Sequence, residues 1–198
     1  MSKTLEQRVE EIELKIKELE KSKQVKFSKL LGVGDTFKLL GLEWKILEIS
    51  NGSYKCLAER LEKSMGFDSD CNDWSASDLR NYLNTDFYKE LANAVGEENI
   101  IPMERDLLSL DGQTEYGTCE DNVSLLTFDE YRKYRKLIPN TNDYWWWLIT
   151  PHSTKCNDDT TWIAVVSSSG DIFSYGCRNG SGVRPFVSFS SAIFESEE

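Results

Sequence analysis

The sequence contains no long apolar run and no segment that resembles a secretion signal. A membrane-spanning helix needs about 18 or more consecutive apolar residues, and the 198 residues contain no such run. The chain opens with Lys3, Glu6 and Arg8, which are charged where a signal peptide carries its apolar segment. We therefore expect a protein that is synthesised in the cytoplasm and has neither a membrane span nor a signal peptide.

Cysteine pairs with metal-binding or redox spacing are also missing. The five cysteines are odd in number, widely separated and free of any C-x-x-C pair. This pattern argues against a disulfide scaffold and against a zinc ribbon. The simplest interpretation is that the cysteines are small apolar residues in a reducing compartment. They are Cys56, Cys71, Cys119, Cys156 and Cys177.

Histidine is nearly absent, since His152 is the only one. A Ser-His-Asp or Cys-His device would have to include it, and its neighbours Ser153 and Cys156 lack the sequence surroundings of a known nucleophile. The Gly-Val-Gly segment at 32–34 lacks the third glycine and the preceding strand of a nucleotide-binding loop. We therefore expect no enzyme, no catalytic residue and no cofactor.

Two metal hypotheses have some support in the residue types. His152, Cys156 and Cys177, with an aspartate of segment 157–159, offer the mixed ligands of a zinc site, but their spacing matches no known finger. The acidic loops at 68–73 and 157–159 offer oxygens for calcium, but neither follows the EF-hand order. Solvated turns account for both groups, and we expect no metal.

The negative charge is concentrated in the main part of the chain. The formal net charge is -11, but residues 1–26 carry seven Lys or Arg against six Asp or Glu, and the rest carries 16 against 28. A surface of that sign repels phosphate backbones and anionic lipids. We therefore expect neither nucleic acid nor a membrane as a partner.

The first residues have the heptad pattern of a coiled coil. The apolar seam consists of Leu5, Val9, Ile12, Ile16 and Leu19. Arg8 and Lys15 fall at g positions and Glu13 and Glu20 at e positions, so opposite charges meet between parallel copies. The seam is too short to hold chains together unaided, and we expect it to complete a homo-oligomer, a dimer or a trimer. The alternative is an amphipathic helix packed on its own domain.

The remaining chain, 27–198, is predicted to form an α+β domain with mainly antiparallel strands, because strands, helices and strands follow one another without a βαβ rhythm. Asn51-Gly52 suits a type I′ turn, and Thr127 with Glu130 has capping-box spacing. Predicted strands cover 36–40, 43–49, 54–58, 145–149, 162–166, 172–175 and 183–189, and predicted helices begin near Ser75 or Ser77, at Thr85 and at Thr127.

Three residues of this domain are predicted to have structural roles. These are Trp74, Arg80 and Arg184. Both arginines stand in apolar stretches, so their guanidinium groups are expected to order neighbouring loops through hydrogen bonds to carboxylates or carbonyls. Such arginines need no ligand to explain them.

Aromatic residues gather among polar ones in the last third of the chain. Because side chains alternate along a strand, Trp145 and Trp147 are expected to face one way and Trp146 the other. At least one of these indoles is therefore predicted to lie outside the main core. Aromatic rings among polar residues suit stacking on sugars or anchoring a protein partner. The alternative is that all the rings are core and the polar residues form turns.

Several motifs resemble those of a domain-of-unknown-function family that is common in Firmicutes and in their phages and prophages. They are Trp74 to Asn84, Leu125 to Glu130, Trp146-Trp147-Leu148 and Gly182-Val183-Arg184-Pro185, within about residues 35 to 190. This family is similar to C-type-lectin-like domains, which include formylglycine-generating enzymes and the variable proteins of diversity-generating retroelements. The resemblance implies a C-type-lectin-like domain at 27–198, which follows the coiled-coil helix that the heptad pattern predicts at 1–26, and it favours a trimer over a dimer.

The resemblance and the aromatic residues lead to a functional hypothesis, which is a receptor-binding or decoration protein of a phage or prophage. Residues 142–181 would display a surface for a cell-surface glycan or protein. The expected contact residues are Tyr144, Trp146, His152, Asn157, Trp162, Tyr175, Arg178 and Asn179. The alternative is a phage protein that stays in the host cytoplasm and inhibits a defence protein. An enzyme of the formylglycine-generating type is less expected, because nucleophiles and metal ligands are few.

Overall fold

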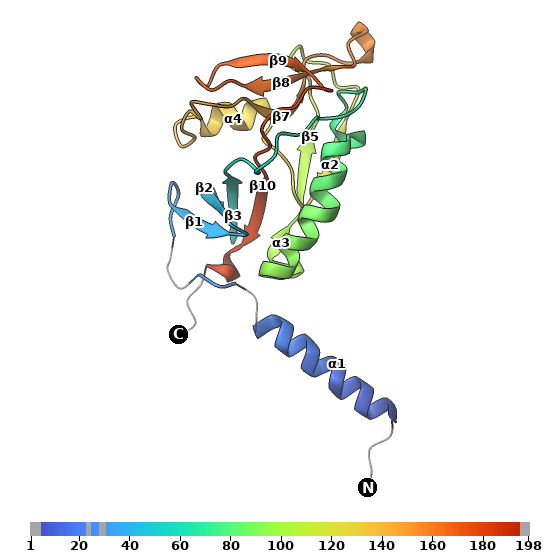
Figure 1. Cartoon of the computed structure of the whole chain (residues 1–198), viewed down its shortest axis with the longest axis vertical. Helices are drawn as coiled ribbons and strands as arrows, with labels where there is room; N and C mark the ends of the chain where they lie inside the picture. The colour runs from blue at the N-terminus through green and yellow to red at the C-terminus, as the bar shows by residue number, and fades with distance from the viewer. Residues whose placement is uncertain (1–4, 23–24, 28–30, 195–198) are drawn as a thin grey trace.

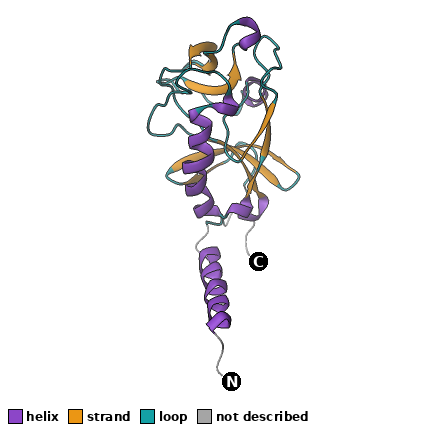
Figure 2. Cartoon of the chain, turned by 90° about the vertical axis from the view of Figure 1, so that its right-hand side faces the viewer, coloured by secondary structure: helices purple, strands orange, loops and turns teal. Residues whose placement is uncertain are grey.

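The computed structural model describes residues 5–22, 25–27 and 31–194, with only the backbone described at 17–22. Its first element is the helix α1 (Leu5–Ser22), which extends away from the rest of the chain (Figures 1 and 2). The helix predicted there is confirmed. Among the described residues, no helix has both the length and the apolar character that crossing a membrane requires.

The apolar stripe of α1 is exposed in the single chain. The side chains of Leu5, Val9, Ile12 and Ile16 are all exposed, and that of Leu19 lies outside the described residues. The alternative in which the stripe packs on the helix's own domain therefore does not hold for these four positions. Pairing with another copy stays a prediction.

The main sheet has five antiparallel strands. They are β1 (Thr36–Leu39), β2 (Leu42–Ser50), β3 (Ser53–Ala58), β4 (Ile100–Ile101) and β10 (Phe186–Ser190). Their order is β1-β2-β3-β10-β4, so the last strand of the chain lies inside the sheet between β3 and β4. Asn51 and Gly52, with φ angles of 49° and 73°, connect β2 to β3. Both angles are left-handed, as a type I′ turn requires, which confirms the predicted turn.

A mainly helical segment follows. It consists of the 3-10 turn η1 (Trp74–Ala76), α2 (Asp78–Tyr82), the π-helical turn η2 (Leu83–Phe87), α3 (Tyr88–Val95) and the 3-10 turn η3 (Glu97–Asn99), and α2, η2 and α3 run on without a break. The hydroxyl of Ser77 accepts a hydrogen bond from the backbone N–H of Arg80 at 3.1 Å, which confirms the predicted cap. The helix predicted from Thr85 to Val95 is present as α3, but it begins at Tyr88, and the predicted start at Thr85 is wrong. Its hydroxyl donates to the carbonyl of Asn81 at 2.7 Å within the π-helical turn that joins α2 to α3.

The segment after η3 forms a two-stranded sheet that the sequence analysis did not predict. Its strands are β5 (Met103–Asp106) and β6 (Thr118–Asp121). Buried and exposed residues alternate along β5, which is the periodicity of a strand with one face covered. The sequence does not display this alternation, because the strand has only four residues and one of its two buried positions is the charged Arg105.

The last part of the chain combines one helix with a three-stranded meander. The elements are α4 (Phe128–Tyr134), β7 (Trp146–Pro151), η4 (Lys155–Asn157), β8 (Trp162–Val166), β9 (Ile172–Gly176) and η5 (Ser191–Ile193). The predicted capping box is present at α4, with Thr127 and Glu130 bonding to each other's backbone N–H groups. The described chain is therefore α+β with antiparallel sheets, as predicted.

Strand β7 lies between two apolar clusters. Trp147 and Ile149 belong to the larger cluster on one face, and Trp146 and Leu148 to the smaller cluster on the other. In the smaller cluster the ring of Tyr131 meets that of Trp146 edge to face, with centroids 5.6 Å apart. Because both faces are covered, all six residues of β7 are buried. A side chain available to a ligand has to come from outside this strand.

Candidate ligand-binding surface

The exposed indole of the tryptophan run is Trp145, which directly precedes β7. Its side chain is 39% exposed, whereas Trp146 is 1% exposed. The expectation that Trp146 contacts a ligand is therefore corrected. Alternation along the strand does put Trp146 and Trp147 on opposite faces, but α4 and its neighbours cover one face and the main core covers the other.

Trp145 forms an aromatic patch with two residues of β9. Its ring stacks on that of Phe173 at 5.1 Å between centroids and 19° between planes. The ring of Tyr175 lies 6.0 Å from Trp145 and 5.9 Å from the buried Trp147. Phe173 is 47% exposed. A stacked indole and phenyl ring that both face water are costly for a monomer to expose, which is typical of a binding surface.

A hollow of about 370 Å³, here called the aromatic hollow, adjoins the aromatic patch. Tyr144, Trp145 and Tyr175 supply aromatic walls, and Arg60 and Ser181 add polar groups. The Ser181 hydroxyl is buried and has no hydrogen-bond partner among the described residues. The hollow thus combines ring faces with polar groups, the usual composition of a ligand site.

Gly182, in the loop between β9 and β10, lets this loop lie close to the segment before β7. A Cβ atom at this position would lie 2.8 Å from the carbonyl oxygen of Trp145 and 2.9 Å from the ring of Tyr144. Its backbone N–H donates to that carbonyl at 2.7 Å. The glycine of the Gly-Val-Arg-Pro motif is therefore needed to seat Tyr144 and Trp145 against the loop.

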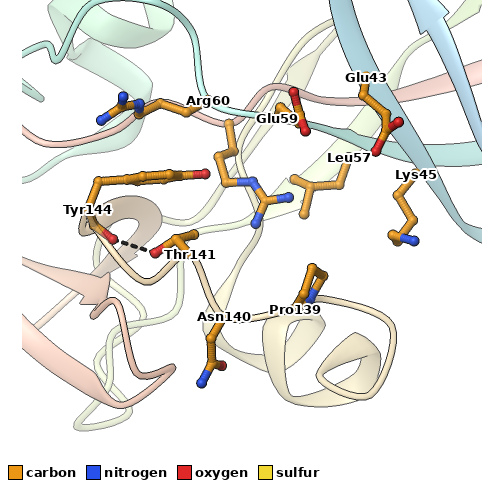
Figure 3. A pocket seen from close by; sticks show the side chains of 10 residues that line it. Glu43, Lys45, Leu57, Glu59, Arg60, Pro139, Asn140, Thr141 and Tyr144 are labelled. Carbon is orange, nitrogen blue, oxygen red and sulfur yellow. Dashed lines mark hydrogen bonds between the residues drawn. The ribbon is translucent and has the colours of Figure 1, made fainter.

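A second hollow of about 380 Å³, here called the Arg184 hollow, also has Tyr144 and Arg60 in its walls (Figure 3). The Arg60 guanidinium carbon lies 4.3 Å from the centre of the Tyr144 ring. The hydroxyl of Thr141 donates to the Tyr144 carbonyl at 2.6 Å, the dashed line in Figure 3. Both hollows therefore depend on the position of the Tyr144 side chain.

Arg184 is the most buried charge in the walls of this second hollow. It is 6% exposed, its Nε donates to the carbonyl of Ala58 at 3.0 Å, and its guanidinium lies 5.0 Å from the Trp146 ring centre. Burial lowers the pKa of Arg184, since a desolvated cation is less favourable. No carboxylate of the described residues forms an ion pair with it.

The structure does not gather the predicted contact residues into one site. Tyr144 and Tyr175 line the aromatic hollow. Trp162 is 49% exposed. Tyr175 pairs with Ile163, the residue next to Trp162 on β8, so Trp162 and Tyr175 face opposite sides of the sheet. His152 is exposed and its Nδ1 lies 2.8 Å from the hydroxyl of Ser174, which shares the face of Trp162.

The other three predicted contacts lie in loops. The side-chain amide of Asn157 donates to Asp111 at 2.9 Å and to Ser153 at 3.0 Å, which ties the turn η4 to a neighbouring loop. Arg178 donates through Nε to the carbonyl of Ser69. Asn179 is exposed, in the loop after β9. These contacts explain Asn157 and Arg178 as loop-ordering residues.

Two of the three predicted structural residues, Trp74 and Arg80, converge on Asp121, which was not among the predicted residues. The indole N–H of Trp74 donates to one carboxylate oxygen of Asp121 at 2.7 Å, and Nε of Arg80 donates to the other at 2.6 Å. Asp121 is 1% exposed. Its position at the end of β6, 41 residues after Arg80, gave no local signal of this contact.

Among the described residues, the group that brings three metal-ligand atoms together is Asp68, Asp70 and Cys71, with those atoms within 4.8 Å of one another. The Asp68 carboxylate already accepts hydrogen bonds from three backbone N–H groups, at Asp70, Cys71 and Asp78. Burial acts to raise the pKa of Asp68, but these donors outweigh it and the pKa is lowered. Loop ordering accounts for the group.

The fold defines an α+β domain with antiparallel sheets that carries an exposed aromatic patch beside two hollows. The chain belongs to the family described as "Domain of unknown function (DUF6273)", whose model matches residues 55–191. That range runs from within β3 to the end of β10 and contains most of the walls of both hollows. No curated protein and no solved structure matches the chain.

Proposed function

We propose that the protein is a phage or prophage ligand-binding protein of the receptor-binding or virion-decoration type. Its ligand is a cell-surface glycan, which it recognises through the aromatic patch and the aromatic hollow. The observation that carries the proposal is the exposed stack of Trp145 on Phe173. The finer fold proposal, a C-type-lectin-like domain, is supported by the resemblance of the motifs and by a strand-and-loop region mounted on an α+β scaffold.

The chemistry of the surface suits a sugar. The C–H face of a sugar ring packs on an aromatic face, and its hydroxyl groups need polar partners at the rim. Trp145 and Tyr175 offer the faces, and Arg60, Ser64 and Asp143 offer donors and acceptors around the aromatic hollow. This combination favours a glycan over a purely apolar ligand.

The helix α1 completes the proposal by joining copies of the chain. Its exposed stripe and its alternating g and e charges fit a parallel homo-oligomer, a trimer or a dimer. Single sugar sites bind weakly. Several sites on one particle gain affinity because each binding event raises the effective concentration of the next.

The proposal is tested by comparing two exposed tryptophans that lie on opposite faces of the three-stranded sheet. Trp145→Ala should weaken binding of the labelled full chain to host cell envelopes by about 2 kcal/mol, or roughly 30-fold, because an aromatic anchor dominates such a surface. Trp162→Ala removes an indole that is 49% exposed, somewhat more than Trp145, and should leave binding unchanged. Both variants should keep the cooperative thermal transition of the parent chain.

Enzymatic treatment of the envelopes identifies the class of ligand. Binding that survives protease but is lost after glycan removal supports the proposal, and protease-sensitive binding would replace the glycan with a protein receptor. Equal binding by Trp145→Ala and the parent chain would overturn the role of the aromatic patch. Equal loss in both tryptophan variants would overturn it as well.

A further inference from the structure

The Arg184 hollow contains a buried positive charge that the protein itself does not neutralise. Arg184 is 6% exposed and lines the hollow, yet no carboxylate of the described chain lies within ion-pair distance. One carbonyl, that of Ala58, accepts from Nε, and no partner among the described residues accepts from the two terminal amines. A buried charge without a partner is unfavourable, so the hollow is suited to an anion.

A second donor faces the same space. The Tyr144 side chain extends into the hollow with its hydroxyl toward the centre (Figure 3). Burial raises the pKa of Tyr144, so the hydroxyl keeps its proton at neutral pH. No acceptor for this hydroxyl is found among the described residues. A planar guanidinium edge next to a phenol O–H matches the two oxygens of a carboxylate.

The charged residues that line the Arg184 hollow determine which ligand charge it favours. Lys45, Arg60 and Arg184 line the hollow together with Glu43 and Glu59, which leaves one formal positive charge. One ammonium is already engaged, since Lys45 donates to the carbonyl of Gly34 at 3.2 Å. A doubly charged phosphate would exceed this net positive charge and would be repelled by Glu43 and Glu59, whereas the single negative charge of a ligand carboxylate neutralises it.

We propose that the Arg184 hollow binds the carboxylate group of a ligand, held by the terminal amines of Arg184 and the hydroxyl of Tyr144. The carboxylate belongs to a free small organic acid or to an acidic sugar. Because the two hollows share Tyr144 and Arg60, an acidic sugar reaches both. The acidic-sugar ligand rests on the proposed glycan function, and the small-acid ligand does not.

The test follows backbone and indole N–H signals of the full chain by nuclear magnetic resonance during titration with acetate, glucuronate or glucose at constant ionic strength. Acetate and glucuronate should give saturable shifts at residues around the Arg184 hollow, and glucose should not. If glucuronate binds more tightly than acetate, and this difference is lost in Trp145→Ala, the acidic sugar is the source. Equal affinities identify the small acid.

Variants decide whether the carboxylate is held as proposed. Arg184→Gln should weaken acetate binding by about 10-fold or more, and Tyr144→Phe by about 5-fold, in line with charged and neutral hydrogen bonds respectively. Tyr144→Phe keeps the ring under Arg60, so it tests the site even if Arg184→Gln does not fold. Arg132→Gln removes an exposed arginine of α4 and should change nothing.

Two results would overturn the carboxylate site. One is the absence of saturable shifts with either acid, and the other is unchanged acid binding in Tyr144→Phe and in folded Arg184→Gln. Glucuronate binding that depends on Trp145 but not on Arg184 would overturn this site while the proposed glycan function stands. Acetate binding that depends on Arg184, in a chain that binds no envelope glycan, would support the carboxylate site and overturn the proposed glycan function.

Discussion

Removal of the Asp121 carboxylate should destabilise the domain more than removal of any exposed carboxylate. Asp121 is 1% exposed and accepts hydrogen bonds from the Trp74 indole at 2.7 Å and from Arg80 at 2.6 Å. In Asp121→Ala the indole N–H remains buried without an acceptor, which costs about 1–3 kcal/mol. Arg80 also loses its carboxylate partner, but its terminal amines keep the carbonyls of Ser75 and Glu120 as acceptors and its side chain is 26% exposed, so this loss costs less.

The two effects together give a loss of about 3 kcal/mol in the free energy of unfolding, at the low end of the range for a broken buried pair. For a chain of this size that corresponds to a fall of about 6–12 °C in the melting temperature. Urea and thermal unfolding, followed by circular dichroism, measure both quantities. The far-ultraviolet spectrum before unfolding checks that the variant is folded at the start.

Asp129→Ala is the matched control. It breaks another aspartate–arginine pair, with Arg132, in which both side chains are more than half exposed. Exposed pairs of this kind contribute about 0–1 kcal/mol. If Asp121→Ala lost no more stability than Asp129→Ala, the assignment of Asp121 as the carboxylate that holds Trp74 and Arg80 would be refuted.

Two further predictions concern Glu48 and α1. Hydrogen bonds from Lys133 and Tyr134 lower the pKa of Glu48 from 4.5 to about 2, so its stabilising effect is present above pH 4.5 and is lost as the pH falls toward 2. Urea unfolding should therefore show Glu48→Gln less stable than the parent at pH 7 and nearly equal near pH 2; a pH-independent difference would contradict this. In sedimentation, Ile12→Asp should convert the proposed oligomer to monomers, whereas Leu14→Asp, at an exposed position outside the heptad seam, should not. Identical behaviour of the two variants would argue against the seam.

The local features of the fold were predictable because short-range chemistry determines them. Asn51-Gly52 forms its turn because both residues adopt left-handed angles at low cost. Thr127 and Glu130 start α4 because each satisfies the other's free backbone N–H. Such interactions span three residues or fewer, and a sequence displays them directly.

The site was only partly predictable because its parts are far apart in the chain. Strand alternation correctly separated Trp146 from Trp147, but it cannot tell that a helix and a sheet cover both faces. The exposed Trp145 therefore went unidentified as a contact residue. The contacts of Asp121 with Trp74 and Arg80 span about 40 residues or more, and nothing in the neighbourhood of residue 121 announces them.

The position of β10 affects how the chain is made as well as how it is folded. β3 and β4 each pair with β10 in the main sheet, and β10 consists of residues 186–190. During synthesis β3 and β4 therefore keep an unpaired edge until residues 186–190 have left the ribosome. Open strand edges are the usual starting points of aggregation. The main sheet is thus completed only after the other strands of the domain have been made, and a truncation before residue 186 leaves β3 and β4 each with an unpaired edge.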